Sequence, residues 1–398
     1  MGDTARNPAR SGIQTVVRSL AGAFAGLRAP VRFVAWNNRR GLLRPLAPEL
    51  SIGEAAEPLR DPNVRWPREL WSQPGAWPFW LLSGFRGKFI PLQRHPLFRL
   101  APPGTWVLMP ELMYKERAAQ LVEYVRRRGW RLAVILYDTI PVEHPEYVPP
   151  ALPAHHAGYL RAFAQADLIL PISEASARGW RSFLAAEGLP GPPVQAVTLA
   201  CDLVGIPRVT DPPAPAPSQG IRLLCVSTLE PRKNHAALLA AYERVVAARP
   251  DLQLSLDLVG AAYGGSEDIE KSVRAAAERL PGLRWHGQVE YDELRALYAR
   301  CDFTVYPSLI EGFGLPVIES LWFGRPCLCA NFGVMAENAA GGGCLTADVR
   351  DPQALADAIL TLATDGDLRR RLTAEATARP LKTWAEYARE ILACLAAH

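Results

Sequence analysis

The residues from Tyr306 to Ser320 read Tyr306-Pro-Ser-Leu-Ile-Glu-Gly-Phe-Gly-Leu-Pro-Val-Ile-Glu-Ser320. They follow a short apolar run and lead into a segment of helical period. Gly312 and Gly314 allow backbone amides to approach a ligand closely, and the proline that follows suits the first turn of a helix. Glu311 precedes this turn and Glu319 lies inside the helix. A strand, a glycine turn and a helix in this order predict a parallel α/β sheet with a ligand at the carboxyl end of the strand.

The same alternation of strand-length apolar runs and amphipathic segments extends through the second half of the chain. We expect strands at Ile221–Ser227, Gln253–Val259, Leu283–His286, Phe303–Pro307 and Cys327–Ala330. We expect helices at Ala236–Ala248, Ser266–Arg279, Tyr291–Arg300 and Pro316–Trp322. Alternation of this kind predicts a parallel sheet covered by helices on both faces.

The first half follows the same pattern. Its expected strands are Val31–Ala35, Thr105–Met109, Leu132–Tyr137, Leu168–Ile172 and Val194–Leu199, with helices at Glu116–Arg128 and Ala154–Ala164. Between Thr210 and Gly220 the sequence TDPPAPAPSQG suits an extended spacer. We therefore predict an α/β protein of two Rossmann-like domains facing across a cleft, residues 1–210 and residues 211–380.

Composition is that of a folded protein, with 49% apolar and 21% charged residues among 398. No apolar run reaches the roughly 18 residues of a membrane span, and we expect a cytoplasmic protein. The seven cysteines lie in the second half and are expected to be buried free thiols. Residues 1–205 hold 24 Lys and Arg against 16 Asp and Glu, a net of +8, which favours an anionic partner for that half. The chain shows no nucleic-acid recognition motif.

A second loop carries two cations. Thr228-Leu-Glu-Pro-Arg-Lys-Asn-His235 follows the first expected strand of the second half and precedes a helix. Arg232 and Lys233 beside a helix N-terminus suit a diphosphate, whose charge grows as it departs. An exposed loop without a ligand is the simpler alternative.

These motifs resemble those of retaining glycosyltransferase family four. Glu311-Gly-Phe-Gly-Leu-Pro-Val-Ile-Glu319 is similar to the E-x7-E element of that family, and Glu230-Pro-Arg-Lys-Asn234 is similar to its diphosphate loop. His286-Gly-Gln-Val-Glu-Tyr291 and Gly341-Gly-Gly343 extend the likeness over residues 220–398.

In the first half the likeness is to bacterial polysaccharide mannosyltransferases. Ser11-Gly-Ile-Gln-Thr-Val-Val-Arg18 resembles their glycine loop and first helix, and Tyr137-Asp-Thr-Ile-Pro-Val-Glu-His-Pro-Glu146 resembles their H-D-L-I-P-x-x-x-P-E segment. Asp138 is retained, whereas Tyr137 stands where many relatives carry histidine.

The resemblance implies the GT-B fold and transfer of a hexose with retention, by front-face attack in which the donor phosphate takes the acceptor proton. It assigns catalytic positions to Glu311, Arg232, Lys233 and Asp138. It assigns donor-binding positions to Gly12, Thr228, Val289, Gly312, Phe313, Gly314, Leu315 and Glu319. Glu311 would position the sugar, Glu319 the ribose, the two cations the diphosphate, and Val289 lies where the family contacts the base.

The implied donor is GDP-mannose and the implied acceptor a glycan or a polyprenyl-diphosphate-linked glycan. The basic charge of residues 1–205 favours an anionic membrane surface as a further partner. Donors carrying UDP or dTDP, a GT-B epimerase or synthase, and a non-catalytic nucleotide-sugar or glycan-binding protein are the alternatives. No metal or other cofactor is expected, because the cations neutralise the phosphates. Asp365-Gly-Asp367, the one D-x-D, is expected to cap a helix.

Two further segments carry expectations. Residues 64–99 interleave aromatic and basic side chains, which suits either a membrane interface or ordinary packing. Trp384, Tyr387, Ala388 and Ile391 give the last helix an apolar stripe. By the resemblance, residues 381–398 return to the first domain, and we expect contacts between residues 384–395 and residues before 210.

Overall fold

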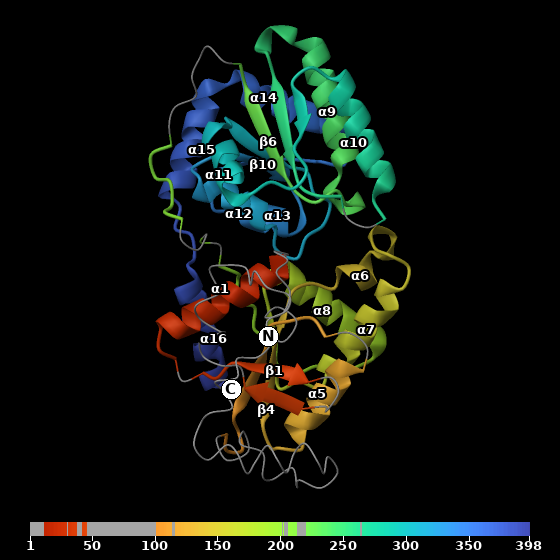
Figure 1. Ribbon diagram of the computed structural model, residues 1–398, viewed down its shortest axis with the longest axis vertical. Helices are drawn as coiled ribbons and strands as arrows, with labels where there is room; N and C mark the ends of the chain where they lie inside the picture. Colours follow the sequence, from red (N-terminus) through yellow and green to blue (C-terminus); the bar gives the residue numbers. More distant parts are fainter. Residues whose placement is uncertain are drawn as a thin grey trace, which may run out of the picture.

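The computed structural model describes residues 12–29, 31–37, 42–45, 101–113, 116–200, 202, 206–212, 220–262 and 265–398. Ser11, Cys201, the aromatic and basic segment 64–99 and residues 213–219 of the expected spacer lie outside these ranges. Two α/β halves lie one above the other along the long axis of the molecule (Figure 1).

The second half is built on a parallel six-stranded sheet of order β11-β10-β9-β6-β7-β8. Its strands are β6 (Arg222–Val226), β7 (Ser255–Val259), β8 (Leu283–Trp285), β9 (Phe303–Tyr306), β10 (Cys327–Ala330) and β11 (Cys344–Ala347). Its helices are η4 (Pro231–Lys233), α9 (His235–Ala248), η5 (Pro250–Leu252), α10 (Glu267–Arg279), α11 (Tyr291–Arg300), α12 (Leu315–Trp322), α13 (Gly333–Ala339), α14 (Pro352–Thr364) and α15 (Gly366–Ala378).

Both faces of this sheet are covered, as the apolar strands predict. Leu223 of β6 packs in a core that α9 and α14 complete, whereas its neighbour Leu224 packs with Leu297 and Tyr298 of α11. Adjacent strand residues point to opposite faces, so this division follows from the pleat. Because the strands are parallel, the loops that follow β6, β9, β10 and β11 leave the sheet at the same edge, which faces the first half.

The first half contains a smaller parallel sheet of order β3-β4-β5 and a separate antiparallel pair β1-β2. Its strands are β1 (Val34–Asn37), β2 (Leu42–Pro45), β3 (Trp106–Met109), β4 (Arg131–Leu136) and β5 (Leu168–Pro171). Its helices are α1 (Gly12–Gly26), α5 (Arg117–Arg126), α6 (Ile140–Glu143), η3 (Pro145–Tyr147), α7 (Leu152–Phe163) and α8 (Glu174–Glu187).

Two expected strands of this half are wrong. The expected strand Val31–Ala35 is displaced to Val34–Asn37 and pairs antiparallel with β2 instead of joining the parallel sheet. In the expected strand Val194–Leu199, only Val194 forms a bridge, with Ile169 of β5. The segment still runs beside β5, since the N–H groups of Gln195, Val197 and Leu199 bond to carbonyls of residues 169–172.

The last helix, α16 (Trp384–Ala397), lies in the first half beside α1 (Figure 1). Trp384 donates its backbone N–H to the Asp202 carboxylate (2.7 Å) and its indole N–H to the Asp202 carbonyl (2.8 Å). The expected apolar stripe on this helix is buried. It packs in one apolar cluster with Leu20 of α1 and with Phe313 and Leu321 from the second half. This cluster joins the two halves.

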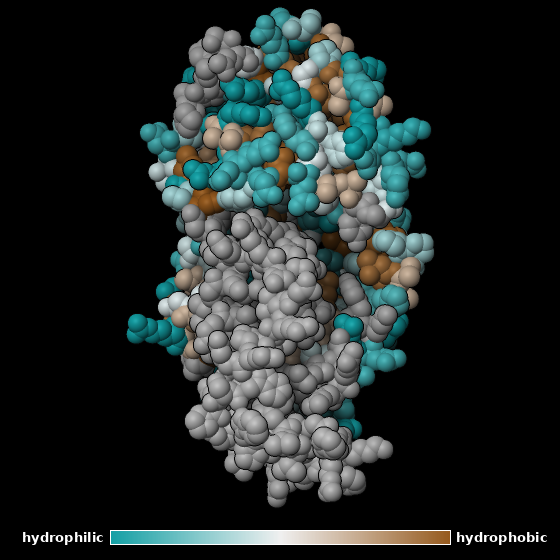
Figure 2. Space-filling model, in the orientation of Figure 1, coloured by the Kyte–Doolittle hydropathy of each residue, from teal (hydrophilic) through white to brown (hydrophobic). Residues whose placement is uncertain are grey.

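Three smaller expectations can be checked. Among the described cysteines, five are buried, Cys344 is partly exposed and all are free thiols. The Asp365 carboxylate accepts from the Leu368 N–H and caps α15, as expected. No helix in the described ranges is long and apolar enough to cross a membrane. On the face shown in Figure 2 the second half presents mainly hydrophilic side chains.

Candidate active site

Glu311 is the centre of a cluster of hydrogen bonds at the edge of the larger sheet. Its carboxylate accepts from Lys233 Nζ (2.5 Å) and Arg232 Nη1 (2.6 Å), and also from Ser308 Oγ (2.6 Å) and Tyr306 Oη (2.8 Å). The side chains of Glu311 and Lys233 are each only 9% exposed. Two cations are therefore paired with one buried carboxylate.

Local backbone structure brings the two cations to this point. Arg232 and Lys233 occupy the short turn η4, which ends at Asn234 in a left-handed conformation (φ 59°) that asparagine tolerates. The Asn234 side chain donates to the Val349 carbonyl (2.7 Å), and α9 begins at the next residue. The cations consequently lie beside a helix N-terminus, where the helix dipole also favours an anion.

The charges of this cluster shift the pKa values of its members. Burial opposes ionisation of Glu311, but the charges of Lys233 and Arg232 outweigh it and lower the pKa of Glu311 to about 2. Burial lowers the pKa of Lys233, an effect that the Glu311 charge opposes. Arg232 also donates Nε to Glu230 (2.9 Å). The carboxylates thus act as counter-ions for the two cations.

The glycine turn next to Glu311 touches the first half directly. A Cβ atom at Gly312 would lie 2.5 Å from the Tyr137 carbonyl oxygen, so this contact requires glycine. Gly314 has φ 84° and precedes α12, and a Cβ atom there would collide with Met335. Phe313 between them is buried in the apolar cluster that joins the halves.

Asp138 faces this turn from the end of β4. Its Oδ1 accepts from the Ile140 N–H (3.1 Å), and its backbone carbonyl contacts His156 Nε2 (3.1 Å). Burial raises the pKa of Asp138, although the charges of His156 and Arg232 oppose the rise. Tyr137 points away: its hydroxyl donates to the buried Pro110 carbonyl (2.7 Å), so this side chain is part of the core.

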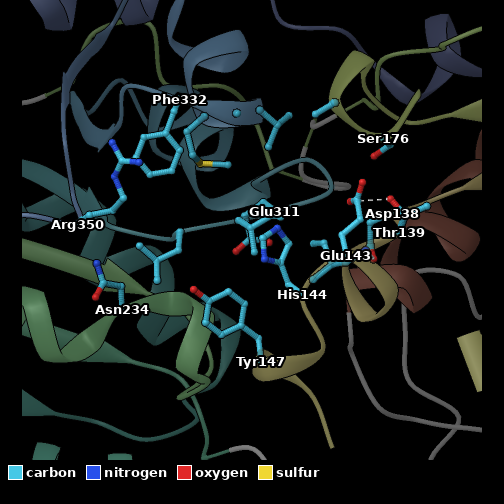
Figure 3. Close-up of a pocket in the computed structure, with 17 residues that line it drawn as sticks. Asp138, Thr139, Glu143, His144, Tyr147, Ser176, Asn234, Glu311, Phe332 and Arg350 are labelled. Carbon is cyan, nitrogen blue, oxygen red and sulfur yellow. Dashed lines mark hydrogen bonds between the residues drawn. The ribbon is translucent and has the colours of Figure 1, made fainter. Parts of the chain in front are cut away.

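A cavity of about 540 Å³ lies between the halves, with Glu311 and Asp138 on its wall (Figure 3). His144 and Tyr147 stack on each other at its side (ring centroids 5.7 Å apart), and Phe332 lies across from them under the Arg350 guanidinium (4.7 Å). The other lining residues are Thr139, Ile140, Glu143, Ala175, Ser176, Asn234, Leu309, Ile310, Gly333, Val334 and Met335.

The remaining candidate positions make no hydrogen bond to Glu311 itself. Glu319 accepts instead from the Tyr298 hydroxyl (3.3 Å), and burial raises its pKa. Val289 packs in the same apolar cluster as Tyr298. The Thr228 hydroxyl donates to Glu230, the residue that also holds Arg232.

Gly12 begins α1 and lies against Leu315, the first residue of α12, because a Cβ atom at Gly12 would be 3.9 Å from the Leu315 side chain. The glycine at the start of α1 thus meets the start of α12 across the boundary between the halves. Among the described residues, no group of three or more His, Cys, Asp or Glu side chains is arranged to hold a metal ion.

Several residues of the site were not expected from the sequence. Ser308 and Tyr306 donate hydrogen bonds to Glu311. They stand three and five residues before it, and this closeness in sequence is the feature from which their contact could have been predicted. Ser173 and Asn338 bond to the carbonyls of the glycine turn. These two are distant from the turn in sequence, so only the fold reveals them.

Sequence comparison matches the half of the chain that contains Glu311, Arg232 and Lys233 to a known family. Residues 210–379 match the family of glycosyl transferases group 1. The O-antigen chain mannosyltransferase B of Escherichia coli is 29% identical over 307 residues, which cover 72% of this chain and 77% of that protein. The serotype-specific mannosyltransferase WbdA of E. coli is 26% identical over 244 residues, 58% of this chain but only 29% of the relative.

Structural comparison supports the whole architecture. The Anabaena protein HepE, solved in complex with UDP and glucose, has a TM-score of 0.57 at 18% identity, covering 74% of this chain and 78% of that one. The E. coli trehalose-6-phosphate protein bound with UDP-2-fluoro glucose has a TM-score of 0.59 at 14% identity, covering 82% and 84%. At these identities the likeness concerns the fold, which is GT-B. Residues 210–379 are therefore a glycosyl transferases group 1 domain, in a chain that is homologous to the E. coli O-antigen mannosyltransferases and has the GT-B fold.

Proposed function

We propose that the protein is a retaining, metal-independent hexosyltransferase that moves mannose from GDP-mannose to a glycan or lipid-linked glycan in cell-surface polysaccharide synthesis. The observation that carries the proposal is the cluster of Arg232, Lys233 and Glu311, largely withdrawn from solvent beside a glycine turn. Its chemistry suits a sugar diphosphate, and the mannosyltransferase relatives favour mannose as the sugar.

In this proposal Arg232 and Lys233 bind the donor diphosphate. Both are held by Glu311 in the structure, so an incoming diphosphate exchanges places with a carboxylate that already compensates their charge. Freed from part of that pairing, Glu311 accepts hydrogen bonds from the hydroxyls of the donor sugar. Charge-assisted bonds of this kind are roughly twice as strong as neutral ones.

The nucleoside lies on the α11 side of the cluster. Glu319 accepts a hydrogen bond from a ribose hydroxyl there. The rest of the donor is bordered by Val289, Thr228 and the start of α1 at Gly12. The amides after Gly312 and Gly314, including those of Phe313 and Leu315, donate to the phosphate and sugar. Asp138 faces the sugar from the first half.

The transfer step follows from this arrangement. An acceptor hydroxyl attacks the anomeric carbon on the face from which the diphosphate leaves, and the bond between that carbon and the phosphate oxygen breaks. The departing phosphate oxygen takes the acceptor proton, so the products are the glycoside and the nucleoside diphosphate. Arg232 and Lys233 stabilise the charge that grows on the leaving group, which is why we propose that no metal ion is needed.

The cavity beside Glu311 is proposed to receive the acceptor sugar. Its aromatic side chains His144, Tyr147 and Phe332 offer apolar faces to a saccharide. The guanidinium on its wall, Arg350, is already paired with Asp348 through two bonds of 2.7 Å. Because no uncompensated cation outside the Glu311 cluster faces the cavity from the described residues, a neutral saccharide suits it better than a phosphate.

We further propose that the protein acts in the cytoplasm and associates reversibly with anionic membranes, bringing it to lipid-linked acceptors. The net charge of +8 on residues 1–205 supports this. Co-sedimentation with liposomes containing anionic lipid tests it: binding at low salt should be lost as salt rises. Absence of binding at low salt, or binding unaffected by salt, would contradict the proposal.

The donor is tested by thermal-shift measurements with GDP-, UDP- and dTDP-sugars, because a bound donor stabilises the folded state by mass action. We expect the largest shift with GDP-mannose. Transfer should survive EDTA, and the anomeric configuration of the product, read by NMR, should match that of the donor. Arg232→Ala and Glu319→Ala should each remove most activity while the protein remains folded.

Each other outcome has a defined meaning. A larger shift with a UDP- or dTDP-sugar changes the donor but retains the enzyme class. Donor binding without transfer to any glycan acceptor favours a non-catalytic binding protein. Loss of activity in EDTA that manganese or magnesium restores rejects the metal-free mechanism.

A further inference from the structure

Two carbonyl groups of the glycine turn are held by side chains from opposite halves of the molecule. The Gly312 carbonyl accepts from Ser173 Oγ (2.7 Å), and Ser176 Oγ, whose single proton it shares with the Tyr137 carbonyl, lies 3.2 Å from it. Both serines are at the start of α8 in the first half. The Phe313 carbonyl accepts from Asn338 Nδ2 (2.5 Å) in the second half. Ser173, Ser176 and Asn338 are all buried.

Holding these carbonyls also fixes the direction of the N–H groups that follow them. A trans peptide is planar, and its N–H points opposite to its C=O. The direction of the Gly312 carbonyl therefore fixes the direction of the Phe313 N–H, and the direction of the Phe313 carbonyl fixes that of the Gly314 N–H. Neither N–H donates to any residue in the described part of the chain, although both residues are buried. Buried N–H groups normally have a partner, so both of these groups remain available to a ligand.

The contact at Gly312 is close enough to be decisive for the geometry. The Tyr137 carbonyl lies 2.5 Å from the position of a Cβ atom at Gly312, and Ser176 Oγ donates to that same Tyr137 carbonyl (2.6 Å). Ser173, Ser176 and Tyr137 thus form one seat in the first half, on which the Gly312 peptide of the second half rests.

We propose that Ser173 and Asn338 are positioning residues that orient the amides of Phe313 and Gly314 toward the donor. Because Ser173 belongs to the first half, the donor turn reaches its working geometry only while the two halves are in contact at Gly312. This inference rests on the proposed role of those amides in binding the donor phosphate and sugar. Orienting these amides stabilises the transition state more than the bound donor, because the leaving group carries more charge in the transition state.

Ser173 also has a structural task that an experiment must separate from this one. Its hydroxyl caps α8 by accepting from the Ser176 N–H (3.0 Å). Removing an N-cap destabilises the helix that it caps. Asp365→Ala removes the cap of α15, which is formed in the same way by a residue outside the proposed site, so it is a matched control.

The experiment compares Ser173→Ala, Asp365→Ala and the unmodified protein. We expect Ser173→Ala to lower kcat about 10- to 100-fold, the range expected when reacting groups are misplaced, with little change in the KM for the donor. Asp365→Ala should retain kcat. Hydrogen exchange at residues 310–316, measured without ligand, should speed up in Ser173→Ala alone. Equal kcat and equal exchange at these residues in the two variants would overturn the inference.

Further arms keep the result interpretable. Ser176→Ala leaves the cap of α8 in place, because that cap uses the backbone N–H, and it should lower kcat in the same direction. If Ser173→Ala does not fold, the kcat of Ser176→Ala decides whether the inference stands. If the unmodified protein transfers no sugar while exchange at residues 310–316 still responds to Ser173→Ala, the proposed function fails and the anchoring of the turn stands.

Discussion

Glu311 shows how one residue can be both a counter-ion and a candidate ligand for a sugar. Its carboxylate accepts four hydrogen bonds, two of them from cations that are themselves buried or partly buried. Breaking a buried pair by removing one partner leaves the other charge uncompensated, which is the expensive case. The cluster must therefore be read as a unit in which Glu311 prepares Arg232 and Lys233 to meet an anion.

The first prediction concerns the acid stability of Glu311→Gln. The folded-state pKa of Glu311, about 2, lies below its ordinary value of 4.5. A depressed pKa stabilises the fold above the unfolded value, and this contribution is lost as pH falls from about 4.5 to about 2. We expect Glu311→Gln to be less stable by about 3 to 5 kcal/mol at pH 7, with the difference shrinking toward pH 3.

Urea unfolding of both proteins at pH 7, 5 and 3 measures this difference, and contributions of the other carboxylates cancel between them. A gap that stays constant over this range would mean that Glu311 is not the ionised partner of the two cations. Arg350→Ala is a useful control, because it removes a cation on the cavity wall that pairs with Asp348 and not with Glu311.

The second prediction concerns Glu319, whose charged form is disfavoured by burial. Burial raises the pKa of Glu319 above 4.5, and its one described partner is the Tyr298 hydroxyl. A raised carboxyl pKa weakens the fold as pH rises from about 4.5 through the folded value. Glu319→Gln should therefore raise Tm at pH 8, with the gain vanishing near pH 4, while it weakens donor binding. A lower Tm at pH 8 would refute this account.

At the scale of elements, the glycine turn depends on space as well as on hydrogen bonds. The third prediction is that Gly312→Ala separates the turn from its seat, since a Cβ atom there would press on the Tyr137 carbonyl and on Asp138. Overpacking of this kind costs about 1 to 3 kcal/mol. We expect a matching loss in urea unfolding and a large fall in transfer rate.

Gly22→Ala is the control for that substitution. Gly22 lies inside α1, where a Cβ atom would meet nothing within 4 Å, and alanine is the better helix former. This variant should be as stable as the unmodified protein or more so. If Gly312→Ala were equally well tolerated, the close contact between the turn and the first half would be absent in solution.

The sequence predicts the elements of the second half more accurately than those of the first. Five of its strands match the expected runs to within two residues, because each is a buried apolar run between clear helix signals. The missed strand, β11, is only partly buried at the edge of the sheet, so its apolar signal is weak. In the first half, Val194–Leu199 is preceded by two prolines, which lack the N–H that a regular ladder needs.

The candidate site was predictable only in part, for a related reason. Glu311, Arg232 and Lys233 stand in local motifs, and the fold brings them together because β6 and β9 are neighbours in the sheet. Ser173 and Asn338 act through the orientation of single peptide groups. No local pattern encodes such a contact, since it depends on how α8 and α13 approach the turn in three dimensions.

At the scale of the whole molecule, the halves are joined by more than the chain between them. The apolar cluster of α1, α16 and the start of α12 crosses the boundary, and Arg178 of α8 pairs with Glu337 of α13 at 2.6 Å. Ser173 adds a hydrogen bond at the donor turn itself. Transfer should consequently depend on contacts that lie far from the reacting atoms.

The last prediction tests this dependence by deleting the residues after Pro380. Deletion removes α16, whose Trp384 holds Asp202 and whose Tyr387 and Ile391 are fully buried in the apolar cluster that joins the halves. Binding of GDP, measured by calorimetry, should change little because the proposed nucleotide contacts are made mainly by the second half. Transfer should fall at least about tenfold, since small misplacements of reacting groups cost that much.

Trp384→Ala should reproduce the effect in weaker form, whereas Arg389→Ala, on the exposed side of the same helix, should leave both binding and transfer intact. Equal losses of GDP binding and transfer on deletion would mean that α16 merely supports the fold of the second half. Normal transfer by the deleted protein would mean that the contact of α16 with α1 and Asp202 has no part in aligning the halves. A loss of transfer with GDP binding retained is the result that requires α16 to act across the boundary.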